Sequence, residues 1–269
     1  MPTIERHEVE TFRELFDTAE GTLYAFDPPV QLLSSFVVAA SRYDETTPPI
    51  RVLAGATTLR RFTRDFEAAA TAAELSAEGR LSVRTDETTE GTTVFATAEA
   101  VFVPVIVGEA DTAVAARRAT FAADVFETCR HAWETRDPFR LTTPSLSTVR
   151  ETLTTEFGRA AAADFEAALS TVTRAPDPTA FDPASVVVMI AARHEQLHYD
   201  VTRWGNEIGL ASKATFSRKK TRLEELGVVT TDTESVPTGR PRQRLSLTEQ
   251  YERRVEESGI DSLVAAVLY

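Results

Sequence analysis

Residues 212–227, SKATFSRKKTRLEELG, are the most constraining stretch of this sequence. Ser212 is predicted to cap a helix, because its hydroxyl can accept a hydrogen bond from a backbone N–H of the first turn. Gly227 stands where helices commonly end in a left-handed residue. One side of this helix is apolar at helical spacing and carries Phe216, Leu223, Leu226 and the aliphatic stem of Lys220. The other side is polar and carries Ser217, Arg218, Thr221 and Arg222.

The segments around this helix have the order of a winged helix-turn-helix. Upstream, Asp182-Pro183 is predicted to open a first helix, with proline at its first position. A second helix is predicted over 199–208, and a tight turn at Gly209-Leu210 leads into the basic helix. Downstream, the β-prone runs 228–231 and 242–247 flank a segment rich in proline and glycine. They are predicted to form a hairpin, the wing.

The distribution of charge supports an interaction with nucleic acid. All three lysines of the chain, Lys213, Lys219 and Lys220, lie in the basic helix. The chain carries −12 overall, but residues 212–244 contain eight basic and four acidic residues, a net charge of +4, which leaves −16 elsewhere. A basic run is often only a solvated helix face. Here it coincides with a helix-turn-helix pattern, so we favour DNA contact.

Three sequence runs resemble a known family. T-F-S-R at 215–218 with R-L-E-x-x-G-V at 222–228 resembles the recognition helix of MarR-like and TrmB-like regulators. W-G-N-E-I-G-L-A-S-K-A-T-F-S-R-K-K-T-R-L-E at 204–224, with V-P-T-G-R-P-R at 236–242, resembles the TbsP family of transcriptional regulators from halophilic archaea. The run D-P-F-R-L-T-T-P-S-L at 137–146 fits as well, and the resemblance is specific from there onward. It implies a promoter-binding regulator of sugar and central carbon metabolism.

The expected partner is therefore double-stranded promoter DNA. The candidate contact residues are Ser212, Lys213, Thr215, Ser217, Arg218, Lys219, Thr221 and Arg222 in the helix, with Arg240, Arg242 and Arg244 in the wing. Arg218 is the candidate for a bidentate contact to guanine. Arg240 and Arg242 are expected to contact phosphates, which position a protein on DNA without specifying sequence.

Residues 1–140 are predicted to form an α/β domain for dimerisation or sensing. Its sequence alternates helical segments (5–19, 30–43, 57–77) with strands (22–26, 50–53, 81–84, 92–96, 100–107). This alternation favours a mostly parallel sheet with an antiparallel edge. The turn 54–58 could present backbone N–H groups to a phosphate of a small-metabolite effector. An ordinary turn between strand and helix is the favoured alternative.

A further helix, 119–133, carries a wide apolar stripe that contains Phe121, Ala122, Val125, Cys129, Ala132 and Trp133. Such a stripe belongs either to the core or to a dimer face. Since palindromic operators are read by two-fold dimers, we expect a homodimer held mainly before Pro183. Cys129 lies within the stripe and is interpreted as a structural thiol rather than a reactive one.

The rest of the chain completes the expected organisation. Residues 141–178 are a helical connector, with helices at 146–157 and 159–173. Residues 179–257 are an α+β winged helix-turn-helix domain, and 258–269 are a C-terminal tail. No run approaches the ~18 apolar residues of a membrane span, and no secretory leader opens the chain. We therefore expect a soluble, cytoplasmic protein without a membrane partner.

One motif supports an alternative, a zinc-dependent hydrolase. Residues 194–198, His194-Glu195-Gln196-Leu197-His198, match H-E-x-x-H, which needs both histidines on one face of a continuous helix and a third ligand. Trp204 occupies the position of the third histidine of metzincins, and the distant Glu224 lies in the basic helix. The winged-helix interpretation also ends a helix near Glu195. We therefore expect no enzyme activity, no cofactor and no metal.

Overall fold

The computed structural model describes residues 12–43, 47–86, 91–107, 110–171, 182–234 and 242–268. The chain forms two compact units, 1–141 and 142–269, and each is described by itself. Within the described ranges, no helix combines the length and the apolar character needed to cross a membrane.

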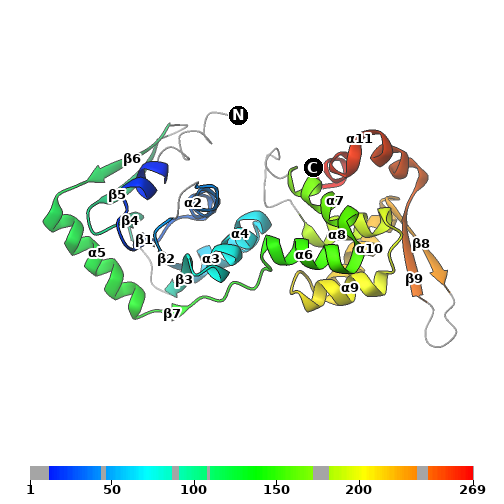
Figure 1. The fold of residues 1–269 in the computed structure, drawn as a ribbon, viewed down its shortest axis with the longest axis horizontal. Helices are drawn as coiled ribbons and strands as arrows, with labels where there is room; N and C mark the ends of the chain where they lie inside the picture. The colour runs from blue at the N-terminus through cyan, green and yellow to red at the C-terminus, as the bar shows by residue number, and fades with distance from the viewer. Residues whose placement is uncertain are drawn as a thin grey trace. The chain divides into compact units, whose positions relative to one another are not determined.

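The first unit contains a mixed seven-stranded sheet (Figure 1). Its strands are β1 (Leu23–Phe26), β2 (Ile50–Gly55), β3 (Leu81–Asp86), β4 (Val94–Ala96), β5 (Val101–Val107), β6 (Ala110–Ala116) and β7 (Asp137–Pro138). They are arranged in the order β6-β5-β4-β1-β2-β3-β7. Only the pairs β1/β2 and β2/β3 are parallel. The pairs β1/β4, β4/β5, β5/β6 and β3/β7 are antiparallel.

The prediction of a mostly parallel sheet is therefore wrong, because antiparallel strand pairs outnumber parallel ones. The predicted α/β class is confirmed. Parallel neighbours need a crossover connection, and helices follow only β1 and β2 on the way to their parallel partners. The strands β4, β5 and β6 succeed one another through short connections and pair antiparallel. The strand β6, with its alanine-rich sequence, was not predicted at all.

Helices cover both faces of this sheet. A helix over residues 12–18, α2 (Val30–Arg42), α3 (Ala56–Phe62) and α4 (Phe66–Ala77) share one core with alternate strand residues such as Leu23 and Ala25. The opposite face is covered by α5 (Ala119–Glu134), whose Cys129 packs with Tyr24 and Ala96 (Figure 1). The first part of the predicted helix 5–19 lies outside the described residues.

The segment predicted as one helix, 57–77, is two helices. The chain leaves α3 at Thr63, and Asp65 begins α4 by accepting a hydrogen bond from the Ala68 N–H at 3.1 Å. A side chain that caps the first turn in this way competes with continuation of the preceding helix. The aspartate was the available sequence signal for this break.

The apolar stripe of α5 divides between the core and the surface. Ala122 and Cys129 are buried, and burial raises the pKa of the Cys129 thiol to about 11, which disfavours a reactive thiolate. Two guanidinium groups lie near the Trp133 ring, with Cζ of Arg51 at 4.6 Å and Cζ of Arg84 at 4.0 Å from its centroid. Trp133 thus packs against arginines of its own chain, whereas Phe121 is 45% exposed.

The second unit is helical, with a two-stranded hairpin (Figure 1). Its elements are α6 (Leu146–Phe157), α7 (Arg159–Leu169), α8 (Pro183–Arg193), α9 (His198–Glu207), α10 (Lys213–Glu225), β8 (Val229–Glu234), β9 (Arg242–Leu247) and α11 (Glu249–Leu268). The helices α6 and α7, which the sequence analysis set apart as a connector, belong to this unit, and α7 packs against α6, α8 and α11.

The expected C-terminal tail is not a tail in the structure. Residues 260–268 continue α11 beyond a break at Gly259, which adopts φ +80°. Ile260, Leu263 and Val264 are buried, at the i, i+3, i+4 spacing of one helix face. The sequence carried this apolar spacing, so the segment was predictable as a helix that contributes to the core.

Candidate DNA-binding site

The helices α9 and α10 form a tightly packed helix-turn-helix. Gly209, with φ +78°, provides the turn between them. Ser212 caps α10 and accepts a hydrogen bond from the Thr215 N–H at 3.1 Å, and Gly227 follows its end with φ +66°. Both predictions for the ends of this helix are confirmed.

One side of α10 is packed against the rest of the unit. Phe216, Lys220 and Leu223 are buried, as predicted. Leu226 is not, since 44% of it is exposed. It follows the last helical residue, and at 3.6 residues per turn it lies about 80° around the helix from Phe216. Its place on the apolar side was therefore predicted wrongly.

Two of the three lysines of α10 form ion pairs within the unit. Lys219 Nζ lies 2.5 Å from Oδ2 of Asp182, at the start of α8. Lys220 Nζ lies 3.1 Å from Oε1 of Glu224, which also accepts a hydrogen bond from Thr231 of β8. Burial raises the pKa of the Glu224 carboxyl, but the hydrogen bonds from Thr231 and Lys220 outweigh this effect and lower the pKa. Lys219 thus links α10 to the start of α8, whereas Lys220 pairs within α10 with Glu224, which connects the helix to β8.

The opposite side of α10 faces solvent with Lys213, Ala214, Ser217, Arg218, Thr221 and Arg222. Arg218 Nη2 lies 3.3 Å from Oγ1 of Thr215, which is half-buried. Arg222 pairs loosely with Glu225, at 3.5 Å. Neither Lys213 nor Arg218 forms an ion pair with any residue that the structure describes. This side therefore presents uncompensated positive charge beside small hydroxyl groups.

The hairpin β8/β9 lies beside this helix as a wing. Its register runs from Val229↔Leu247 to Glu234↔Arg242, which confirms the predicted hairpin. Arg242 is exposed, whereas Arg244 donates a hydrogen bond from Nη1 to the carbonyl of Glu195. Arg240 lies in the tip, outside the described residues. The arginines of the wing therefore have different surroundings.

The family comparison agrees with this geometry. A model for the N-terminal domain of TbsP-like transcriptional regulators matches residues 2–144, and one for their C-terminal helix-turn-helix domain matches residues 145–267. The chain belongs to the TbsP-like transcriptional regulators. No curated protein and no solved structure matches it. The second unit of this TbsP-like protein is thus its helix-turn-helix DNA-binding domain.

The zinc-hydrolase alternative is overturned for this TbsP-like chain. Its family is one of transcriptional regulators rather than enzymes. The helix α8 ends at Arg193, His194 follows it as the C-cap, and Glu195 adopts φ +49° before α9 begins at His198. The two histidines therefore do not share a continuous helix face. His194 Nε2 lies 2.7 Å from Oδ2 of Asp164, and the described residues contain no group of three potential metal ligands.

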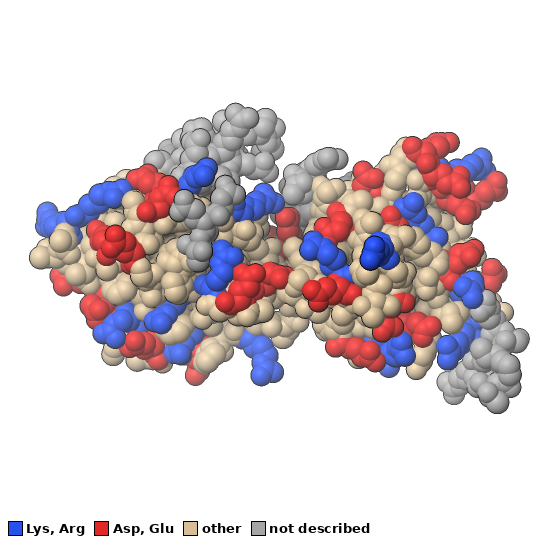
Figure 2. Space-filling model, in the orientation of Figure 1, with Lys and Arg blue, Asp and Glu red and all other residues tan. Residues whose placement is uncertain are grey.

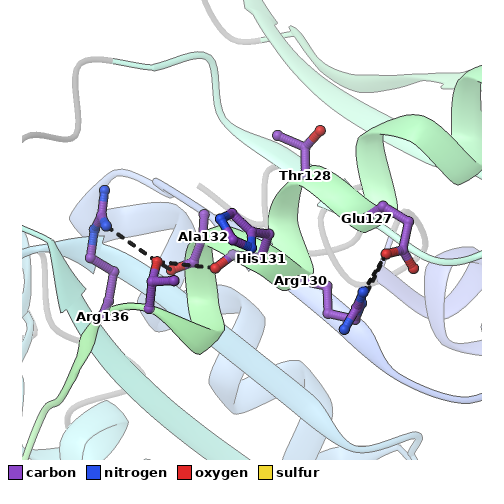
Figure 3. A pocket seen from close by; sticks show the side chains of 7 residues that line it. Glu127, Thr128, Arg130, His131, Ala132 and Arg136 are labelled. Carbon is purple, nitrogen blue, oxygen red and sulfur yellow. Dashed lines mark hydrogen bonds and ion pairs between the residues drawn. The ribbon is translucent and has the colours of Figure 1, made fainter.

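Two features of the N-terminal domain of the TbsP-like protein bear on the expected effector. Of the predicted turn 54–58, residues 54–55 end β2 and residues 56–58 already belong to α3, which has only seven residues and no side-chain cap at Gly55. A surface cavity of ≈ 650 Å³ on α5 is lined by Glu127, Thr128, Arg130, His131, Ala132, Thr135 and Arg136 (Figure 3). Its arginines are already paired, Arg130 with Glu127 and Arg136 with Asp86.

Acidic and basic side chains alternate over the visible face of both units (Figure 2). The net charge of −12 is thus not spread evenly over the surface. Screened charges act over about 10 Å or less at 0.1 M salt, so the local surface of α10 decides whether it can meet DNA. Its uncompensated lysine and arginine satisfy that requirement.

Proposed function

We propose that this TbsP-like regulator binds promoter DNA sequence-specifically as a homodimer, with α10 in the major groove and the wing along the backbone. The exposed side of α10 carries this proposal, because Lys213 and Arg218 have no carboxylate partner among the described residues and stand beside Ser217 and Thr221. A helix that carries Arg and small hydroxyl residues toward base edges is the usual means of direct readout.

Within this proposal the candidate residues have distinct roles. Arg218, with Ser217 and Thr221, reads base edges, whereas Lys213, Arg222, Arg240 and Arg242 meet phosphates. Ser212 and Thr215 order the first turn of α10, whose N–H groups also favour an anion. Lys219 and Arg244 contribute mainly to folding, since each already interacts within the unit.

The homodimer is supported by exposed apolar residues in the N-terminal unit. Val114 of β6 is 59% exposed and Phe121 of α5 is 45% exposed. Contiguous exposed apolar patches mark surfaces that another molecule covers, and we propose that these two residues belong to such a patch. A single helix-turn-helix reads one half-site, so a two-fold symmetric dimer is expected to bind a palindromic operator with two half-sites.

The family resemblance implies target promoters of sugar and central carbon metabolism, and these are included in the proposal. An acidic composition, with only three lysines, is consistent with an origin in a halophilic archaeon. We include a small-metabolite effector bound to the N-terminal unit, because that unit has its own core and contributes none of the candidate DNA contacts.

The function is tested by selecting bound sequences from random duplex DNA and measuring affinity for the selected site and a scrambled one. We expect a selected palindrome, and we expect Arg218→Ala to lose about 1–3 kcal/mol of the preference between the two duplexes. Arg254→Ala, which removes an exposed arginine from α11, is the matched control. Failure to enrich any sequence, at low as well as high salt, would contradict the proposal.

A further inference from the structure

Tyr199 is an exposed aromatic residue at the start of the helix-turn-helix. It lies in the first turn of α9 and is 51% exposed, whereas Val201, Thr202 and Trp204 of the same helix are buried. Its ring faces Arg242 of the wing, whose Cζ lies 5.2 Å from the ring centroid. This distance is within the range of a cation–π interaction. Two elements distant in sequence therefore meet at the surface through this pair.

The backbone around the pair fixes its position. Leu197 forms a β-bridge with Arg244, and the Leu245 N–H donates to the carbonyl of Gln196 at 3.0 Å. The segment before α9 thus lies against β9 and is joined to it by a single antiparallel bridge. Tyr199 follows Leu197 by two residues, and Arg242 precedes Arg244 by two. In this antiparallel arrangement Tyr199 and Arg242 are the next pair of residues toward the tip of the wing.

The guanidinium of Arg242 keeps its hydrogen-bonding capacity. It is exposed, and it forms no ion pair with any residue in the described part of the chain. A cation–π contact occupies none of the N–H donors of the guanidinium with an acceptor atom, so they remain free for an oxyanion. Arg244, two residues further along β9, instead donates a hydrogen bond to the carbonyl of Glu195.

We infer that Tyr199 is a positioning residue for DNA binding, which holds the guanidinium of Arg242 ready to contact a backbone phosphate. This inference rests on the proposed function. A free arginine side chain loses much rotamer freedom when it binds, and a stack that restricts it beforehand reduces that loss. An exposed cation–π contact corresponds to about a two- to five-fold change in affinity.

A double-mutant cycle on the full chain tests the inference. Affinity for the selected site and for scrambled duplex is measured for wild type, Tyr199→Ala, Tyr199→Phe, Arg242→Ala and the double variant Tyr199→Ala/Arg242→Ala. We expect Tyr199→Ala to weaken both duplexes alike, by about two- to five-fold. Tyr199→Phe should bind as wild type, because it keeps the ring. In the Arg242→Ala background, removal of Tyr199 should have no further effect.

Three results would overturn the inference. Additive losses in the double variant would show that Tyr199 acts independently of Arg242. An equal loss in Tyr199→Phe and Tyr199→Ala would assign the effect to the hydroxyl, and a loss confined to the selected site would assign it to base reading. Thermal denaturation of each variant separates a folding defect, which should be absent, from a DNA effect. If wild type binds no duplex, the proposed function itself has failed.

Discussion

Gly205 of α9 lies against the ring of Phe216 of α10, so closely that a Cβ atom on the glycine would approach Cε2 and Cζ of the ring to 2.4 Å. Phe216 is fully buried, so its ring has little space to move away. The separation of the two helices therefore depends on the absence of a side chain at position 205.

We predict that Gly205→Ala destabilises the DNA-binding unit by about 1–3 kcal/mol, because it overpacks a filled core. It should also weaken DNA binding by displacing α10. Gly91→Ala is the matched control, since its Cβ would meet Phe26 at 3.5 Å, an ordinary contact. Chemical denaturation measures both variants, and partial recovery in Gly205→Ala/Phe216→Leu would support the steric cause. Equal stability of the two glycine variants would contradict it.

A second prediction distinguishes the roles of Lys213 and Lys219 in α10. Lys213→Ala should reduce the slope of log affinity against log salt by about one unit, which corresponds to the loss of one phosphate contact. The reason is that the ammonium group of Lys213 is exposed and uncompensated. Lys219→Ala should leave the salt slope nearly unchanged and lower the melting temperature, because it leaves Asp182 with the hydrogen bond from Ser185 but without a cationic partner. Titrations over a range of salt concentrations, with thermal denaturation, measure both. The reverse assignment would show that the ion pair of Lys219 opens on DNA.

The ends of α10 could be predicted from sequence because their signals are local. Ser212 and Gly227 act on backbone groups within one turn of themselves. The partner of Lys219 could not be predicted, since Asp182 is brought to it by the packing of α8 against this helix. Lys220 instead pairs with Glu224, four residues ahead in the same helix, and this spacing is visible in the sequence. The sequence therefore predicts the helix-turn-helix correctly but overstates how many of its lysines are available.

Tertiary pairing limits the prediction of the sheet and of the wing in the same way. The order of strands and helices indicates an α/β unit, but the antiparallel pairing of β4 with β1 joins segments that lie far apart in the sequence. Tyr199 and Arg242 lie in different elements and are brought together by the tertiary pairing of residues 196–197 with residues 244–245. No local pattern marks such a contact.

A third prediction concerns pH. Burial lowers the pKa of His198, and the charge of Lys220 lowers it further, against opposing effects from Glu224 and the backbone of Phe216. The unfolded chain, with a value near 6.5, therefore binds the proton more readily than the folded chain does. It follows that the free energy of unfolding decreases as pH falls below about 6.5 and is constant above it.

Melting temperatures from about pH 8 to about pH 5.5 measure this effect. His198→Asn should remove part of the decrease on the acid side, whereas His131→Asn, on the exposed side of α5, should retain it. The carboxyl of Glu224 does not obscure the comparison. Its pKa is lowered from 4.5, so its own contribution is lost only at more acid pH. An unchanged pH profile in His198→Asn would contradict the assignment.

The last prediction addresses the homodimer. Phe121→Glu should convert the proposed full-length homodimer to monomer, because a two-fold interface contains the residue twice. Burying one such side chain contributes about 1.5–3 kcal/mol, so the pair of changes should weaken association by about 3–6 kcal/mol. Light scattering after size-exclusion chromatography measures the mass. Affinity for a duplex with two half-sites should then approach that for a single half-site.

Leu226→Glu is the matched control, because Leu226 is an equally exposed apolar residue, at 44%, in the other unit. If the N-terminal unit holds the dimer together, this variant keeps the wild-type mass, and circular dichroism shows both variants folded. A dimer that persists in Phe121→Glu and dissociates in Leu226→Glu would assign the interface to the DNA-binding unit. The interface would then lie beside the end of α10 and would set the spacing of the two half-sites directly.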